Sequence, residues 1–540
     1  MTQRVRDEIL PVIPLGHSGT RHFFYFVRVT RQIVRLSSGA HTPASFLAMA
    51  MEPDWLNWPG VRLGQHGIDW SSLSEILMGE CREKGIYDPD CARGRGAWRD
   101  GTDVVFHAGD TIYVNGEETQ FDNFHSSEFR YVAAVKAMRP SNEAATAKDG
   151  EELISTLNTW GWDQTELAPR LVLGWIGCAL ICGALSWRPH MWITGTKGSG
   201  KSTLDDLISN LLGNLALHIQ GNTTEPGLRQ ALNGDARPIL FDEFEADNRT
   251  AAAVIDAARA AASDNSAVIA KGSSDGKPNL FRLRFSALFS GIIANVHREA
   301  DRSRIVFLEI HAVERDEEQR RAFLEARKRF DTDFGGALLR RMLDALNSRR
   351  FDDTLAKFRI AIRLLGGDER KADVFGQLLA AHHVLTSDDN INEMEARPLA
   401  ALISKLDEGE PSDEDACISH LLGYRLKVER EYDRTIGEWI LFALEYDIHS
   451  PPRDAVLAEL ERHGIKKDGS SIKIANHVTG IKRVFYGTRW ADGGHWRIIR
   501  RLPDAQPGGN AWFAGEQSKC TVVPITSLIP PADYLYPPDE

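Results

Sequence analysis

Met-Trp-Ile-Thr-Gly-Thr-Lys-Gly-Ser-Gly-Lys-Ser-Thr is the sequence of residues 191–203. It contains Gly195-x-x-x-x-Gly200-Lys201-Ser202, which matches the whole Walker A pattern. The first four residues have the apolar character of a short buried strand. After the glycines, apolar residues recur at helical spacing until a stop signal at Gly213: Leu204, Leu207, Ile208, Leu211 and Leu212. A strand, a glycine loop and a helix in this order predict a phosphate-binding loop.

The residue types in this loop predict that the chain binds a nucleoside triphosphate with Mg²⁺. Glycines let the backbone bend so that its N–H groups face a phosphate, and the helix N-terminus adds partial positive charge. Lys201 is expected to reach the β- and γ-phosphates, and the Ser202 hydroxyl to ligate Mg²⁺. ATP is favoured over GTP because no Asn-Lys-x-Asp motif is present. The predicted nucleotide-binding residues are Gly195, Thr196, Lys197, Gly198, Ser199, Gly200, Lys201, Ser202 and Thr203.

Two adjacent carboxylates, Asp242 and Glu243, follow an apolar segment further along the chain. A strand and a helix are predicted between this segment and the glycine loop, which is the context of a Walker B strand. Asp242 is expected to hold the water shell of the Mg²⁺ ion, and Glu243 to polarise the attacking water. Both are therefore predicted catalytic residues together with Lys201.

The core is predicted to be α/β, with a five-stranded, mostly parallel sheet and helices on both faces. Its strands are expected at 191–194, 216–220, 237–241, 286–295 and 304–310, with a hairpin formed by 267–271 and 280–285. Asn295 ends the strand that is expected beside Walker B. Its amide either orients the attacking water or contacts the γ-phosphate, or it only begins a turn.

The regions on either side of this core differ in composition. The first region is rich in β-branched and aromatic residues with turn signals between them, and the region after the core is rich in Arg, Glu and Ala. A winged-helix module is predicted from apolar strands at 484–486 and 496–499. The predicted parts are a β-rich domain (1–140), a linker and buried helix (141–189), the P-loop core (190–312), a helical region (313–408), the winged helix (409–525) and a tail (526–540).

The bulk composition is that of an ordinary soluble protein: 540 residues, 42% hydrophobic and 26% charged. The net charge of −12 argues against wholesale coating of nucleic acid, although a local basic groove is compatible with it. The six cysteines show no zinc-ligand spacing and suit a reducing cytoplasm. The uncharged segment 171–187 is either a short membrane span or a buried helix, and the buried helix is favoured.

Taken together, these motifs resemble an AAA+ ATPase, and the hairpin placement resembles the superfamily 3 viral helicases. Most of residues 10–525 are similar to the C-terminal helicase part of phage- and plasmid-type DNA primase-helicases found in bacterial prophages. The stretches that carry this likeness, besides the Walker motifs, are Pro14–His17, Arg93–Trp98, Thr224–Gln230, Lys271–Ser273 and Ala300–Ile305.

The resemblance implies an ATP-hydrolysing DNA helicase or translocase that works as a hexameric ring in the bacterial cytoplasm. It implies single-stranded or forked DNA as partner, and DNA replication as the process. In such proteins a primase domain often precedes this region, and this chain starts after that point. We therefore expect primer synthesis to come from a separate primase or replication protein. No membrane partner is expected.

The resemblance also implies roles for individual residues. Asn295 corresponds to a sensor-1 residue. Arg304 is expected to complete the ATP site of a neighbouring subunit, with Arg302 and Arg298 as rivals, or else to pair with an acid such as Glu309. Lys271 and Lys277, near the hairpin tip, are expected to grip the DNA backbone, unless they belong to a solvated turn.

Three interpretations remain open at this stage. The favoured one is the DNA motor, and the second is an AAA+ switch or remodeller that acts on a protein partner. The third is a degenerate nucleotide binder used as a scaffold, which the intact Lys201, Asp242 and Glu243 count against. The basic stretch 93–98 either contacts a phosphate backbone or is a solvated turn.

Overall fold

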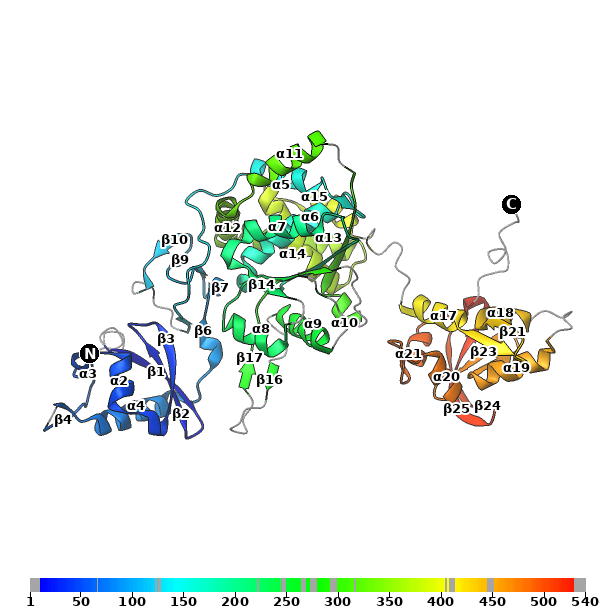
Figure 1. Cartoon of the computed structure of the whole chain (residues 1–540), viewed down its shortest axis with the longest axis horizontal. Coiled ribbons are helices and arrows are strands. Elements are labelled where there is room, and N and C mark those ends of the chain that lie inside the picture. Colours follow the sequence, from blue (N-terminus) through cyan, green and yellow to red (C-terminus); the bar gives the residue numbers. More distant parts are fainter. Residues whose placement is uncertain are drawn as a thin grey trace. The chain divides into compact units, whose positions relative to one another are not determined.

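The chain folds as two units, residues 1–406 and 407–540, in the computed structural model (Figure 1). The structure describes residues 10–65, 67–121, 124, 128–220, 223–242, 244, 249–263, 269–271, 279–291, 299–314, 317–403, 406, 413–443 and 451–528. The predicted domain boundaries at 140, 189, 312 and 408 stay predictions.

The centre of the first unit is a six-stranded sheet with the order β12-β19-β13-β18-β15-β14. Five strands run parallel, as predicted. The sixth, β12, pairs antiparallel with β19 at the edge and was not predicted. The strands are β12 (Gly161–Trp162), β13 (His190–Gly195), β14 (Leu217–Gln220), β15 (Ile239–Asp242), β18 (Ala287–Gly291) and β19 (Ile305–His311). The mixed α/β class with a parallel-rich sheet is therefore confirmed.

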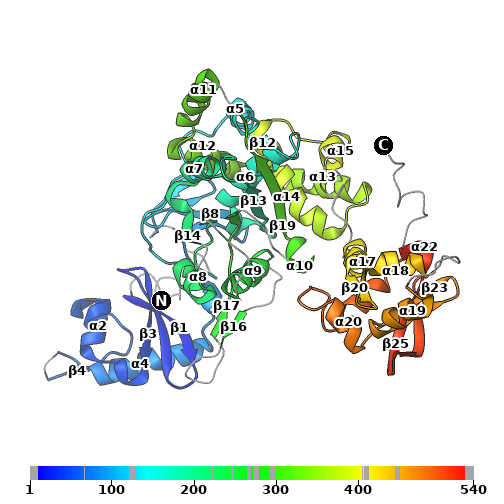
Figure 2. The same ribbon diagram turned by 45° about the vertical axis from the view of Figure 1, so that its right-hand side comes forward.

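Helices cover both faces of this sheet because alternate residues of each strand point to opposite sides. Trp192 of β13 belongs to a hydrophobic cluster with α8 (Glu225–Leu232) and α9 (Arg249–Ala261). Its neighbours Met191 and Ile193 belong to another cluster, with α6 (Ala168–Leu180) and α7 (Lys201–Leu212). Figures 1 and 2 show the two helix pairs on opposite sides of the strands.

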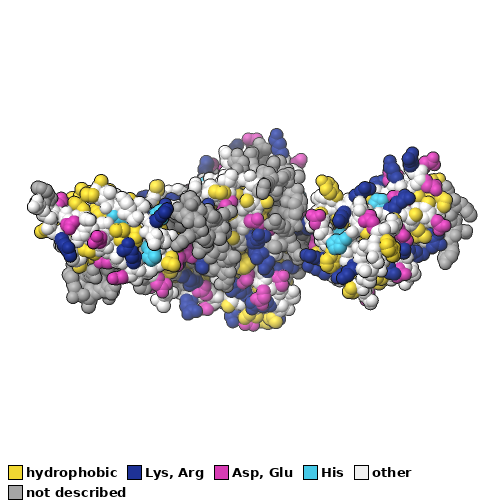
Figure 3. All heavy atoms as spheres, turned by 90° about the horizontal axis from the view of Figure 1, so that it is seen from below, with side chains coloured by type: hydrophobic (Ala, Val, Ile, Leu, Met, Phe, Trp, Pro, Cys, Tyr) yellow, Lys and Arg dark blue, Asp and Glu magenta, His cyan; other side chains and the backbone are white. Residues whose placement is uncertain are grey.

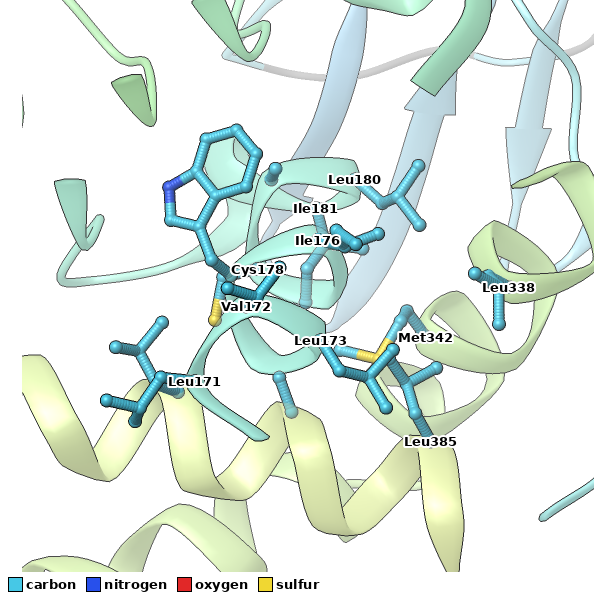
Figure 4. Close-up of a cluster of buried hydrophobic side chains, with 14 of the residues drawn as sticks. Leu171, Val172, Leu173, Ile176, Cys178, Leu180, Ile181, Leu338, Met342 and Leu385 are labelled. Atoms are coloured by element: carbon cyan, nitrogen blue, oxygen red, sulfur yellow. The ribbon is translucent and has the colours of Figure 1, made fainter. Parts of the chain in front are cut away.

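The helix α6 is buried over almost its whole length, which suits a segment that is uncharged after Arg170 in its first turn. Its apolar side chains meet Leu338 and Met342 of α12 (Thr332–Asn347) and Leu385 of α14 (Glu369–Thr386) (Figure 4). Gly174 allows the closest approach, since a Cβ there would lie 2.1 Å from the carbonyl oxygen of Leu378. Within the described part of the chain, no helix is long and apolar enough to cross a membrane.

The predicted helical region after the core is present in the described residues. Its helices are α11 (Glu317–Lys328), α12, α13 (Arg350–Leu364), α14 and α15 (Glu393–Ala401). Buried residues of α12 to α15 share one continuous hydrophobic cluster with α6, α7 and one face of the sheet. This region therefore packs directly against the core that carries the glycine loop.

The N-terminal region is β-rich, and both predicted hairpins are present. β2 (His22–Val27) pairs with β3 (Gln32–Ser37), and β1 (Val12–Ser18) completes a three-stranded sheet. β8 (Asp103–His107) pairs with β9 (Ile112–Val114), in a four-stranded sheet with β7 (Gly96–Asp100) and β10 (Glu117–Thr119). A single long helix, α4 (Trp70–Lys84), packs on the first of these sheets.

The stretch Arg93–Trp98 is not a solvated turn, which corrects that interpretation, while its contact with a phosphate backbone stays a prediction. The Arg93 guanidinium carbon lies 4.4 Å from the centre of the Trp98 ring and is buried. Arg95 forms an ion pair of 2.6 Å with Asp235. Gly96 has φ +117°, and a Cβ there would lie 2.0 Å from the Ala236 carbonyl oxygen. The glycines therefore let this stretch lie directly against residues 234–236.

The second unit differs from the predicted winged helix in two places. Residues expected as strands at 484–486 and 496–499 end α20 (Thr479–Val484) and form α21 (Gly494–Ile499). The observed sheet is instead β22-β23-β25-β24. Its strands are β22 (Ile465–Asp468), β23 (Ser471–Ala475), β24 (Gln506–Phe513) and β25 (Glu516–Pro524).

Further helices and a hairpin surround this sheet. They are α17 (Asp413–Gly423), the hairpin β20 (Arg425–Val428) and β21 (Tyr432–Thr435), α18 (Ile436–Phe442) and α19 (Arg453–Arg462). The predicted tail begins inside a short helix, α22 (Ile525–Leu528), whose Leu528 is buried. The rest of the tail lies outside the described residues.

Candidate nucleotide-binding site

The glycine loop lies between β13 and α7, as the Walker A pattern predicts. Gly198 and Gly200 have φ values of +86° and +88°, in the left-handed region that other residues rarely adopt. Gly195 is required for a different reason, because a Cβ there would lie 2.6 Å from the Ile310 carbonyl oxygen. Loop residues 196–198 are exposed, so their backbone is open to a ligand.

The helix that follows the loop packs as predicted. The five apolar residues from Leu204 to Leu212 that define its periodicity are all fully buried in the cluster beneath the sheet. Lys201, in its first turn, donates hydrogen bonds to the carbonyl oxygens of Gly291 (2.8 Å) and Gly195 (3.3 Å). The Lys201 ammonium thus lies between the ends of β13 and β18, where the loop begins.

Asp242 is the last residue of β15 and is exposed. It lines a cavity of about 280 Å³ together with Ser202, the residue after Lys201. In the sheet order, β18 separates β15 from β13, so the carboxylate and the hydroxyl approach the cavity from different elements. The structure therefore brings together the two predicted Mg²⁺ ligands.

Several predicted site residues cannot be placed. Glu243, Asn295 and Lys277 lie outside the described residues. Lys271 ends β16 (Ile269–Lys271), which pairs antiparallel with β17 (Asn279–Phe281), so the predicted hairpin is present in its described part. The tip of this hairpin, between the two strands, also lies outside the described residues.

The chain resembles solved structures but no protein family model. No protein-family model matches the chain, and no curated protein matches it. The chain is similar to a solved structure described as "SCCmec type IV Cch - active helicase", with a TM-score of 0.51 and 13% identity over 96% of this chain and 94% of that one. This likeness shows a shared fold.

A second solved structure, the apo C-terminal region of NrS-1, is also similar over most of its length. It aligns with 95% of this chain and 96% of that one at 11% identity, with a TM-score of 0.33. A TM-score this low does not establish a shared fold.

Asp205 is a residue of this site that the sequence analysis missed. It lies one helical turn after Ser202 and lines the same cavity as Ser202 and Asp242. Ser290 of β18 donates a hydrogen bond of 2.7 Å to Asp205 Oδ2. The pKa of Asp205 is raised to about 6, chiefly by burial and also by the nearby Asp242 carboxylate, which together outweigh the lowering effects of Ser290 and Lys201. An Asp on a helix is usually a solvated residue, so no local signal revealed this one.

Trp160 is a second missed residue. Its indole Nε1 donates a hydrogen bond of 3.0 Å to the carbonyl oxygen of Gly200. The indole is 4% exposed and makes an edge-on contact with Phe323 of α11, with ring centres 4.8 Å apart. Trp160 therefore fixes the last peptide of the glycine loop from the segment that leads into β12.

Arg304 lies far from this site within one chain. It immediately precedes β19, whose first residue, Ile305, pairs with His190 at the beginning of β13. The glycine loop follows the other end of β13, roughly 16 Å away at the usual rise of a strand. Burial lowers the pKa of Arg304, and the positive charges of Arg370 and Arg259 lower it further.

The described residues offer few protein ligands for a metal ion. Among them, no group of three or more His, Cys, Asp and Glu side chains is arranged to hold one. Ser202 and Asp242 would supply two oxygen donors, so the remaining donors would have to come from a ligand or from water. This is the coordination that Mg²⁺ has in nucleotide sites, where substrate phosphates complete its shell.

Proposed function

We propose that the chain binds ATP with Mg²⁺ and hydrolyses it in a P-loop AAA+ core. The observation that supports this most is the left-handed glycine pair at 198 and 200, followed by Lys201 at the start of α7. The exposed loop backbone fits a polyphosphate, and Ser202 and Asp242 fit an octahedral cation that also binds phosphate oxygens. In this proposal Mg²⁺ neutralises charge on the β- and γ-phosphates, and Lys201 exchanges its carbonyl partners for phosphate oxygens.

Hydrolysis requires a group that orients water, and Glu243 is proposed for this role. It directly follows Asp242 in the sequence, at the carboxyl end of β15. Asn295 is proposed to orient the same water or to contact the γ-phosphate. It follows β18, which lies between the two Walker strands in the sheet.

The work that hydrolysis drives is proposed to be movement along single-stranded or forked DNA, as a helicase or translocase of the phage- or plasmid-type family. The shared fold with a protein described as an active helicase supports this proposal. A role in DNA replication, with a primase or another replication protein as partner, belongs to the same proposal.

The proposed DNA contacts are local. The net charge is −12, and on the face seen in Figure 3 the Lys and Arg side chains are interspersed with Asp and Glu. A backbone grip by Lys271 and Lys277 at the tip of the β16–β17 hairpin therefore suits the chain better than a broad basic surface. In the second unit, α18 and α19 are followed by the hairpin β22–β23, the order in which a winged-helix module would place its elements.

The proposed assembly is a homo-oligomeric ring, with a hexamer as the expected form. Because Arg304 lies at the opposite end of β13 from the glycine loop, it cannot serve the site of its own chain. A ring would let it reach the γ-phosphate bound by a neighbour, where a guanidinium offers paired N–H donors.

The experiment that tests this function measures ATP hydrolysis by the full chain with and without single-stranded DNA. A DNA motor should be stimulated several-fold, and Lys201→Ala should abolish both the basal and the stimulated rates. A chain that hydrolyses ATP without responding to DNA would instead support the alternative, an AAA+ switch or remodeller that acts on a protein. A parental chain that does not hydrolyse ATP under either condition would refute the proposal.

A further inference from the structure

Asp205 occupies an unusual position for a carboxylate. Its backbone is in α7, and its Oδ2 atom is held by the Ser290 hydroxyl at 2.7 Å. Its Oδ1 atom is buried and has no hydrogen-bond partner among the described residues. A buried carboxylate oxygen that lacks a hydrogen-bond donor costs free energy. A donor from a bound ligand or its water shell would remove this cost.

The surroundings of Asp205 indicate what that partner is. The carboxylate shares a cavity of about 280 Å³ with Asp242 and with the Ser202 hydroxyl. Two carboxylates repel one another, and the Lys201 ammonium is already hydrogen-bonded to two backbone carbonyls. A divalent cation with its water shell would neutralise both carboxylates and supply donors to the free oxygen.

We infer that Asp205 is a positioning residue of the Mg²⁺ site, whose Oδ1 accepts a hydrogen bond from a metal-bound water. The inference rests on the proposed ATP site and adds a residue that belongs to neither Walker motif. Ser290 has a defined part in it, because its hydroxyl fixes the orientation of the Asp205 carboxylate. The pair Asp205–Ser290 would thus connect the helix after the glycine loop to the strand that leads toward Asn295.

A purely structural role for Asp205 is the competing explanation, since its hydrogen bond to Ser290 also joins α7 to β18. The two explanations differ in what the charge does. A metal-positioning carboxylate strengthens the binding of ATP only when the cation is present. Without the cation it repels the phosphates and weakens binding. A structural hydrogen bond would affect both forms of the nucleotide alike.

The test compares ATP affinity in Mg²⁺ with ATP affinity in EDTA, by calorimetric titration of the full chain. Asp205→Asn keeps an acceptor for Ser290 and removes the charge. We expect its affinity for MgATP to fall about 10–100-fold, the usual cost of losing an outer-shell partner, while its affinity for metal-free ATP is kept or improved. Asp344→Asn is the matched control, because that carboxylate on α12 is 43% exposed and does not line the cavity, and it should retain the parental ratio of the two affinities.

The hydrogen bond from Ser290 to Asp205 can be tested separately, through the affinity of the site for a divalent cation. Ser290→Ala leaves the charge but frees the carboxylate, so it should lower the affinity of the ATP-bound chain for Mn²⁺, measured by electron paramagnetic resonance. An unchanged ratio of affinities in Asp205→Asn would overturn the inference, and so would an equal loss in both conditions. If the parental chain bound ATP in neither condition, the proposed function itself would fail, which is a different result.

Discussion

We expect the buried His190, at the start of β13, to make the folded protein less stable at acidic pH. His190 is completely buried, donates a hydrogen bond of 2.7 Å from Nε2 to the Ala258 carbonyl oxygen, and accepts one of 3.0 Å at Nδ1 from the Ala287 N–H. Because Nδ1 is an acceptor, the ring is neutral in the folded state. Its pKa is lowered to about 4, chiefly by burial and also by the charges of Arg188 and Arg304, against the raising effect of the hydrogen bond to Ala258.

The sign and size of the effect follow from the difference between the folded and unfolded states. The unfolded chain binds a proton with a pKa near 6.5, and the folded chain only near 4. The contribution of His190 to the free energy of unfolding is therefore fully present above about pH 6.5 and is lost as the pH falls toward 4. At about pH 5 the loss in the free energy of unfolding is about 2 kcal/mol, taking 1.36 kcal/mol for each unit of pKa.

The perturbation is His190→Gln, because a glutamine amide can donate to the Ala258 carbonyl and accept from the Ala287 N–H without titrating. Urea unfolding of both proteins at about pH 7.5 and about pH 5 gives the measurement. Other titrating groups are common to both proteins, so their contributions cancel in the comparison. We expect the parental protein to lose about 2 kcal/mol more than the variant on acidification. Equal losses in the two proteins would refute the assignment of a neutral, buried His190.

Three further experiments test the Walker residues, the proposed role of Arg304 and the packing of α6. Lys201→Ala should abolish nucleotide binding, whereas Glu243→Gln should bind ATP and hydrolyse it slowly. Hydrolysis is measured by phosphate release. Hydrolysis at the parental rate in the Glu243→Gln variant would contradict the Walker B assignment. Arg304→Ala and Lys201→Ala proteins should each be inactive but recover some ATPase activity when mixed, and mixed rings without recovery would leave Arg304 no role in a neighbour's site. Gly174→Ala should destabilise the first unit by about 1–3 kcal/mol, because its Cβ would meet the Leu378 carbonyl oxygen. Gly79→Ala is the control, because a Cβ at Gly79 would have no atom from the rest of the described chain within 4 Å. Thermal unfolding should find this control unchanged or slightly more stable.

The parts of the fold that the sequence predicted correctly depend on neighbouring residues. The glycines at 195–200 specify their own backbone geometry, and the helix after them repeats its apolar residues within a few turns. Thr224 caps α8 in the same local way, since its hydroxyl accepts from the Gly227 N–H three residues later. Such signals are local, so a single sequence contains them in full.

The features that were missed depend on partners far away in the chain. The stretch 93–98 was compatible with a solvated turn, because Asp235, the ion-pair partner of Arg95, is 140 residues away. Trp160 is defined as a site residue only by its contact with Gly200, and Asp205 only by Ser290. The short segments 484–486 and 496–499 were predicted as strands, because three apolar residues in each do not distinguish a strand from a short helix.

The continuous hydrophobic cluster beneath the sheet determines where this chain can be cut for study. It includes residues from Ala97 to Ile403, among them Leu207 of α7, Leu338 of α12 and Leu378 of α14. A fragment that stopped at residue 312 would leave the apolar faces of α6 and α7 without α12 and α14, and exposed faces of that kind favour aggregation. Ending the fragment after residue 406 keeps the cluster whole, because the second unit has a separate hydrophobic cluster that begins at Cys417.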